Sequence, residues 1–129
     1  MGGFDVLAIA NSALGAHQTW LDALGHNIAN ANVVRRTDEE AFREQLVDVV
    51  TAPEGGVAVR SIQQGDGEGR MVHDPDHPLA DENGYVRMTS MDMNTQMTAL
   101  IVAQRGYQAQ VSVTQTARAD YDAALQIGR

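Results

Sequence analysis

The sequence contains no cysteine and no lysine, and it has few aromatic residues. Without cysteine, the chain can form no disulfide and offers neither a thiolate metal ligand nor a cysteine nucleophile. One tryptophan, three tyrosines and two phenylalanines supply little aromatic material for a compact core. We therefore do not expect a globular enzyme with a large internal cavity.

Positive charge is also scarce. Nine basic residues, all of them arginine, oppose seventeen acidic ones, which gives a formal net charge of −8 over 129 residues. A protein that binds nucleic acid needs a cationic face, so this balance argues against a nucleic-acid partner. The length fits one domain, or a small domain with long extensions.

Long hydrophobic runs are missing as well. The longest apolar run near the N-terminus covers residues 6–10, whereas a helix needs about 20 residues to cross a bilayer. No lipid-spanning segment is therefore predicted. The first arginine is Arg35, so the positive region of a cleavable secretory signal is absent too. Any export is expected to use a route that needs no such signal.

The charge that is present divides the chain into three parts. Residues 33–92 hold six of the nine arginines and thirteen of the seventeen acids, and both flanks are almost neutral. We expect an N-terminal helical region at 1–32, a small β-rich outer region with loops at 33–91, and a C-terminal helical region at 92–129.

Both flanks show helical periodicity. A helix is predicted over residues 4–28, ending near Asn27, Asn30 and Asn32 because asparagine tolerates the left-handed conformation found at helix ends. A second helix is predicted over 92–127, with Asp92 as its N-cap and Gly128 as its stop. Apolar residues recur at spacings of three and four, which predicts a seam along each helix. The seam positions are Leu7, Ala10, Leu14, His17, Leu21, Leu24 and Ile28, then Met93, Met97, Leu100, Gln104, Tyr107, Val111, Thr114, Arg118, Tyr121 and Leu125.

The middle region has the short alternating patterns of β-strands. Candidate strands lie at 42–50, 56–62, 71–72 and 85–88, separated by glycine-rich and proline-containing turns. The predicted fold class is therefore mainly α with a small β region. Long N- and C-terminal helices pair as a coiled coil, and short antiparallel strands lie between them.

One cluster of residues invites a metal-site interpretation. Its members are His73, Asp74, Asp76, His77 and Asp81. Two histidines four residues apart bind metal well on a helix, but two nearby prolines prevent a helix here. The glycine-rich stretch 65–69 lacks the Lys-Ser/Thr pair of a phosphate loop. We predict no metal, no cofactor and no catalytic residues, and hence no enzyme.

The seams remain as the candidate functional feature. Two thin seams cannot cover each other completely, so Leu14, Trp20, Leu24, Ile101 and Val113 are expected to stay largely exposed. An exposed apolar surface of that extent marks an interaction site. The alternatives are a monomeric two-helix hairpin on a sheet, and a helical adaptor or chaperone-like module that binds one partner without polymerising.

Particular motifs carry a family resemblance. Residues 21–32 (LDALGHNIANAN) resemble the N-terminal motif of bacterial flagellar rod and hook proteins, and 78–86 (PLADENGYV) is similar to the proximal-rod members of the flagellar basal-body rod protein family. Residues 105–109 (RGYQA) and 124–129 (ALQIGR) agree with that family too.

The resemblance implies a structural subunit of the basal-body rod, which polymerises through its terminal helices into the axial drive shaft needed for motility. It implies as partners other rod proteins, the rod-to-motor adaptor protein, copies of the chain itself and the flagellar type III export apparatus. The implied location is the flagellar basal body in the cell envelope, within the periplasm where an outer membrane is present.

Residues along both seams are the expected assembly interface. They are Leu7, Leu14, Leu21, Leu24, Asn27, Ile28, Asn30, Met97, Leu100, Gln104, Tyr107, Val111, Tyr121 and Leu125. Polar residues of the two helices are expected to hydrogen-bond between subunits and fix their register, as buried polar groups do in coiled coils.

Overall fold

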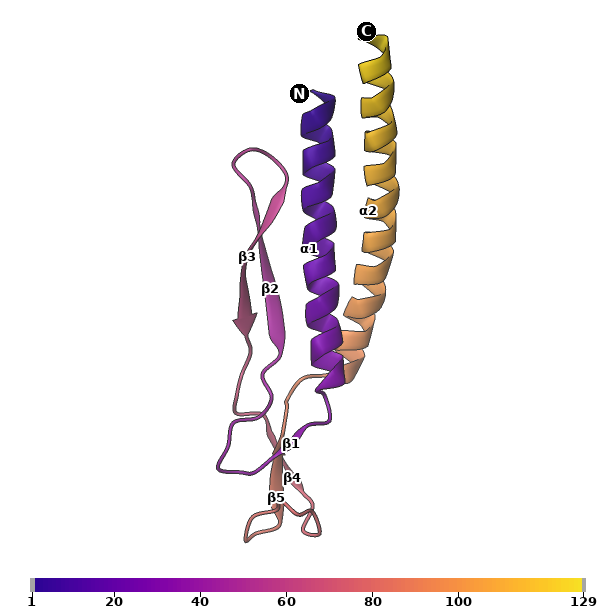
Figure 1. The fold of residues 1–129 in the computed structure, drawn as a ribbon. Coiled ribbons are helices and arrows are strands. Elements are labelled where there is room, and N and C mark those ends of the chain that lie inside the picture. The colour runs from indigo at the N-terminus through magenta and orange to yellow at the C-terminus, as the bar shows by residue number, and fades with distance from the viewer. Residues whose placement is uncertain (1, 129) are drawn as a thin grey trace.

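A computed structural model describes residues 2–128 as two long helices beside two small antiparallel sheets. The first turn of the N-terminal helix and the last turn of the C-terminal helix lie at the same end of the elongated molecule (Figure 1). The fold class predicted from the sequence is confirmed. In chain order the elements are α1 (Gly3–Ala29), β1 (Val34–Arg35), β2 (Gln45–Thr51), β3 (Val57–Gln64), β4 (Arg70–His73), β5 (Tyr85–Met88) and α2 (Met93–Ile127).

The helix ends lie where the sequence predicts them. Asp92 caps α2 by accepting a hydrogen bond from the Asn94 N–H at 3.1 Å, and α2 stops before Gly128. The C-cap of α1 is Asn30, but its φ of −105° is not left-handed, so the predicted mechanism for this end was wrong. The Asn30 side-chain amide instead donates to the carbonyl of His26 at 2.8 Å.

The two helices pair through small residues. Ala10 of α1 and Ala103 and Ala117 of α2 are buried. A Cβ atom at Gly106 would lie only 2.8 Å from Nε2 of His17, so a larger side chain there would have to displace the His17 ring. Small residues of this kind allow close backbone approach, and the larger apolar side chains are left to point elsewhere.

The predicted seam coincides only partly with the covered face of α2: six of its ten positions are half-buried and four are exposed. Gln96, Ala103 and Ala117 are buried, whereas their neighbours Met97, Gln104 and Arg118 are exposed. The physical reason is size, and for Arg118 also charge: alanine fits the narrow space between the helices, while the longer side chains of Met97, Gln104 and Arg118 reach solvent.

The strands form two separate units. β2 and β3 make an antiparallel hairpin with a bulge after Asp48, and this hairpin lies along α1 on the side away from α2 (Figure 1). The N–H of Val57 donates to Oγ of Ser12 at 3.2 Å, which ties the hairpin to the helix. The second unit has the strand order β1-β5-β4 and lies beyond the helices, at the end opposite the termini. The sequence did not predict the two-residue strand β1.

The hairpin changes which side chains are covered. Leu24 is only 5% exposed, so the expectation that it stays uncovered was wrong. Leu14 and Trp20 are half-buried, whereas Ile101 and Val113 are exposed as expected. Packing explains the difference, because α1 contacts both α2 and the hairpin, while α2 contacts α1 and none of the described strands.

The close approach at Gly106 can be tested with a matched pair of substitutions. Gly106→Leu should lower the free energy of unfolding, because overpacking costs about 1–3 kcal/mol and outweighs the gain in helix propensity. Gly15→Leu should raise it by up to about 1 kcal/mol, because nothing lies within 4 Å of a Cβ atom there. Urea unfolding followed by circular dichroism measures both, and a shift of the two variants in the same direction would contradict this packing.

Candidate assembly interface

A buried amide joins the three parts of the molecule. The side chain of Asn27, near the end of α1, is 1% exposed. Its Nδ2 donates to the Gln45 carbonyl at 3.0 Å and to Oε1 of Gln96 at 3.2 Å, and its Oδ1 accepts from the Gln45 N–H at 2.7 Å. Nε2 of Gln96 in turn donates to a carboxylate oxygen of Glu44 at 2.9 Å. We call Asn27, Glu44, Gln45 and Gln96 the Asn27 joint.

The Asn27 joint fixes how the helices and the hairpin are oriented. The amide of Asn27 pairs with both backbone groups of Gln45, as a neighbouring strand would, at the first residue of β2. Gln96 contributes the first turn of α2 to the same network. Because buried polar groups are costly when unpaired, this geometry is strongly preferred over alternatives that break it.

The residues predicted as an assembly interface fall into three groups by exposure. Leu24 and Asn27 are buried within the chain. Three others are exposed on α2, namely Met97, Gln104 and Leu125. The remaining nine are half-buried: Leu7, Leu14, Leu21, Ile28, Asn30, Leu100, Tyr107, Val111 and Tyr121.

Sequence reasoning missed the part of this surface that comes from the hairpin. Val47, Val49 and Val57 line a groove against α1, and Gln96 was not singled out. Val57 and Val59 are two residues apart, and this spacing indicates that one face of the strand is apolar. Gln96 gave no signal, because a glutamine beside a seam is ordinarily a solvent-exposed residue.

The candidate metal cluster does not come together as a site. The His73 ring packs edge-on against Tyr85 with 4.9 Å between ring centres, and Nδ1 of His77 accepts from the Leu79 N–H at 3.0 Å. Within residues 2–128, no group of three or more His, Asp or Glu side chains is arranged to hold a metal ion.

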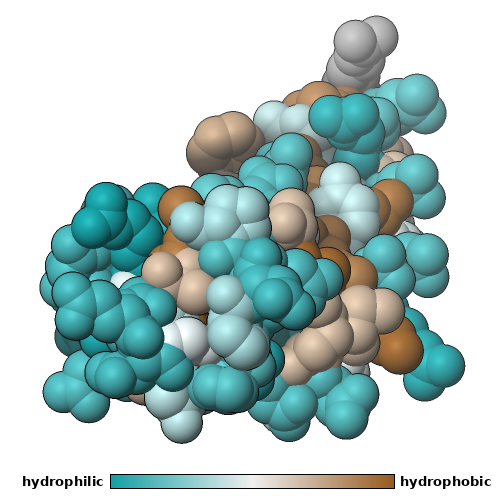
Figure 2. Space-filling model, turned by 90° about the horizontal axis from the view of Figure 1, so that it is seen from below, coloured by the Kyte–Doolittle hydropathy of each residue, from teal (hydrophilic) through white to brown (hydrophobic). Residues whose placement is uncertain are grey.

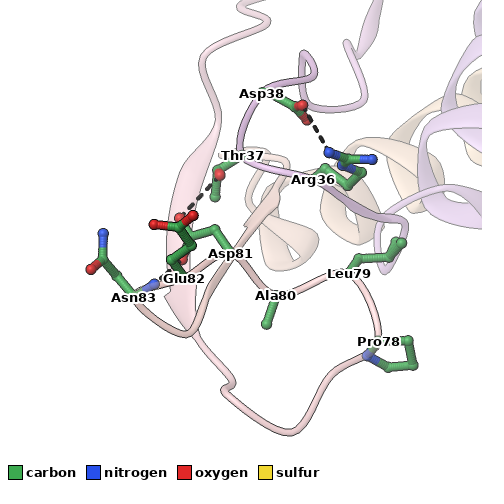
Figure 3. A pocket seen from close by; sticks show the side chains of 9 residues that line it. All are labelled: Arg36, Thr37, Asp38, Pro78, Leu79, Ala80, Asp81, Glu82 and Asn83. Atoms are coloured by element: carbon green, nitrogen blue, oxygen red, sulfur yellow. Dashed lines mark hydrogen bonds and ion pairs between the residues drawn. The ribbon is translucent and has the colours of Figure 1, made fainter.

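Beside that cluster, a shallow polar pocket of about 570 Å³ lies between residues 36–38 and 78–83. Figure 3 shows Arg36 directed at Asp38 within the first of these segments, and Thr37 directed at Asp81, which connects the two segments. Asp81 also accepts from the N–H groups of Asn83 and Tyr85, each at 2.9 Å. These hydrogen bonds lower the pKa of the Asp81 carboxyl below its usual value, and the bond from the Tyr85 N–H contributes most. The charged side chains of this pocket therefore stabilise the conformation of the loops that line it.

Comparisons with known proteins place these features in a family. The family model "Flagellar basal body rod FlgEFG protein C-terminal" matches residues 82–127. The flagellar basal-body rod protein FlgC of Salmonella typhimurium is 34% identical, and that of Yersinia enterocolitica 37% identical, over alignments covering the whole of both chains. The FlgC protein of Bacillus subtilis is 26% identical, also over the full length of both chains. The resemblance to proximal-rod members is thereby confirmed. Neither described helix has a stretch apolar enough to cross a membrane.

Replacing the buried amide tests the Asn27 joint. Asn27→Asp keeps the shape but removes two hydrogen bonds and places a carboxylate in a buried site. It should lower the free energy of unfolding at neutral pH by about 2–4 kcal/mol. Burial raises the pKa of the introduced carboxyl, so the loss should shrink as pH falls through that raised value. Asn30→Asp, on the less buried neighbour, should cost less than about 1 kcal/mol. Equal losses in urea unfolding would contradict the joint.

The loop at Asp81 supplies a pH test. Because its pKa is lowered in the folded chain, the hydrogen bonds of Asp81 persist as the pH falls to the ordinary value of 3.8 and are lost only below it. Carboxyl-carbon NMR of the folded chain should therefore show a titration midpoint below that of the same residue in urea. A midpoint at or above 3.8 would contradict the loop geometry.

Proposed function

This chain belongs to the FlgC family of flagellar basal-body rod proteins, and we propose that it builds the rod by packing its terminal helices against those of neighbouring subunits. It is a structural protein of the flagellar basal body, and not an enzyme. Like its relatives, it associates with other components of the rod.

The observation that carries this proposal is the exposed apolar surface of α2. Met97, Ile101, Val102, Val113 and Leu125 are between 43% and 55% exposed. In a single chain these side chains remain in water, although burying each would contribute about 1.5–3 kcal/mol. Neighbouring subunits in a rod would cover them, and this explains why a helix so incompletely covered is retained.

We propose that the three regions of the chain have different places in the rod. Residues 1–32 and 92–129 form the axial core, and residues 33–91 form the smaller outer part. Seen from the end that carries the three-stranded sheet, the outer part shows mostly hydrophilic residues (Figure 2). Long paired helices also resist bending and twisting, which a shaft that transmits torque requires.

The finer partners belong to the same proposal. We propose contacts with copies of itself, with other rod proteins and with the rod-to-motor adaptor protein. Export through the flagellar type III apparatus, without a cleavable signal, would bring the chain to the cell envelope, within the periplasm where an outer membrane is present. A non-polymerising adaptor is not favoured, because the similarity to rod proteins extends over the whole chain.

Substitution near the end of α2 tests the role of the helices in assembly. Leu125 is 52% exposed and should pack against a neighbouring subunit. In a strain lacking the native gene, Leu125→Asp should therefore abolish swimming in soft agar and leave no complete rods, while secretion of the subunit continues. Gln126→Asp, which adds the same charge one residue later, should support at least half of normal swimming.

Two results would contradict the proposal. The first is normal swimming with Leu125→Asp. The second is a strain lacking the gene that still assembles complete rods, as seen by electron microscopy of isolated basal bodies.

A further inference from the structure

An apolar groove lies between α1 and the hairpin. The groove has a volume of about 360 Å³ and is lined by Ala13, Ala16, Trp20, Val47, Val49 and Val57. His17 closes the side nearest α2, with its ring 6.4 Å from that of Trp20. None of the lining residues is an acid or an arginine.

The hairpin face beside this groove is only partly covered. Val47 lies opposite Ile62, and Val49 lies opposite Val59, so these side chains share the face that meets α1. Ile62 is nevertheless 50% exposed and Val49 44% exposed. A two-stranded hairpin needs a hydrophobic cover for stability, and contact with α1 leaves these two side chains about half exposed.

A complementary surface is present on α2. Met97 and Ile101 are one turn apart, 43% and 49% exposed, and form what we call the α2 ridge. The α2 ridge lies in the stretch 93–104, which has no charged residue. Within this stretch Gln96 and Ala103 are buried while Met97 and Ile101 are exposed, so residues 2–128 cover the ridge only in part.

The net charge of the chain limits where two copies can meet. Each chain carries a formal net charge of −8, so two copies repel each other unless they meet where charge is absent. The groove and the α2 ridge are two such surfaces. We propose that the groove of one subunit receives the α2 ridge of a neighbouring copy, an inference that rests on the proposed role as a rod subunit.

The geometry of this contact allows copies to add to one another repeatedly, head to tail. The hairpin and α2 lie on different sides of α1 (Figure 1), so a chain cannot place its own ridge in its own groove. A contact between two different surfaces leaves one of each free on every pair, and repetition builds a ring or a helical filament rather than a closed dimer. The contact thus has the symmetry that a rod subunit needs.

Cysteine cross-linking tests the contact. Because the native chain has no cysteine, every disulfide that this chain forms involves an introduced residue. A chain with both Val49→Cys and Ile101→Cys is expressed in a strain lacking the native gene, and basal bodies are isolated and oxidised with copper phenanthroline. A disulfide requires the two Cα atoms within about 7 Å. Nonreducing gels should show a ladder of cross-linked copies that collapses to one band on reduction.

Controls separate the contact from chance collisions. Copies carrying only Val49→Cys, mixed in one strain with copies carrying only Ile101→Cys, should give dimers and no ladder. Val49→Cys combined with Thr116→Cys, an exposed position about 22 Å further along α2 than Ile101, should give less than a tenth of the cross-linking. A second pair, Val47→Cys with Met97→Cys, samples the same contact if the first pair reduces assembly.

The outcomes distinguish this inference from the proposed function. Intact rods without cross-links from either pair overturn the groove contact and leave the rod function standing. A cross-link to a chain of different mass overturns it as well, because the groove then receives another rod protein. If the unaltered chain itself fails to restore rods, the proposed function fails instead.

Discussion

The buried amide of Asn27 is the constraint on which the arrangement of the molecule depends. It connects the end of α1 to the first residue of β2 and to the first turn of α2, with donor and acceptor both paired. Three elements that are distant in sequence therefore meet at one point with defined geometry. Since breaking such a buried network leaves polar groups unpaired, the helices and the hairpin are held as one stiff unit. A subunit that transmits torque needs that property.

Given this joint, the chain uses different residues for its own folding and for assembly. Alanines, Gly106 and the amide network join the elements within one chain. The larger aliphatic side chains of α2, such as Ile101 and Val113, stay exposed. Small residues give close approach inside the subunit, while the large apolar ones provide the area that we propose is buried between subunits. The concentration of acidic charge in residues 33–92 leaves the helical surfaces free of repulsion between copies.

Local signals in the sequence predicted the elements well, because helix caps and strand alternation act over a few residues. Asp92 and Gly128 bound α2 as predicted, and four strands lie near their predicted places. Features that depend on tertiary packing were not accessible. A three-four spacing does not say whether Ala103 or Gln104 faces the partner helix. Nothing local indicates that the hairpin covers α1, or that Gln96 is buried against Asn27.

Imaging an intact basal body by electron cryomicroscopy, with this chain traced, tests the central claim most directly. We expect α1 and α2 to lie in the axial core with the Asn27 joint unchanged. Met97, Ile101 and Leu125 should be buried against neighbouring subunits. A rod in which this chain is absent would contradict the account. So would a rod in which these side chains remain in contact with water.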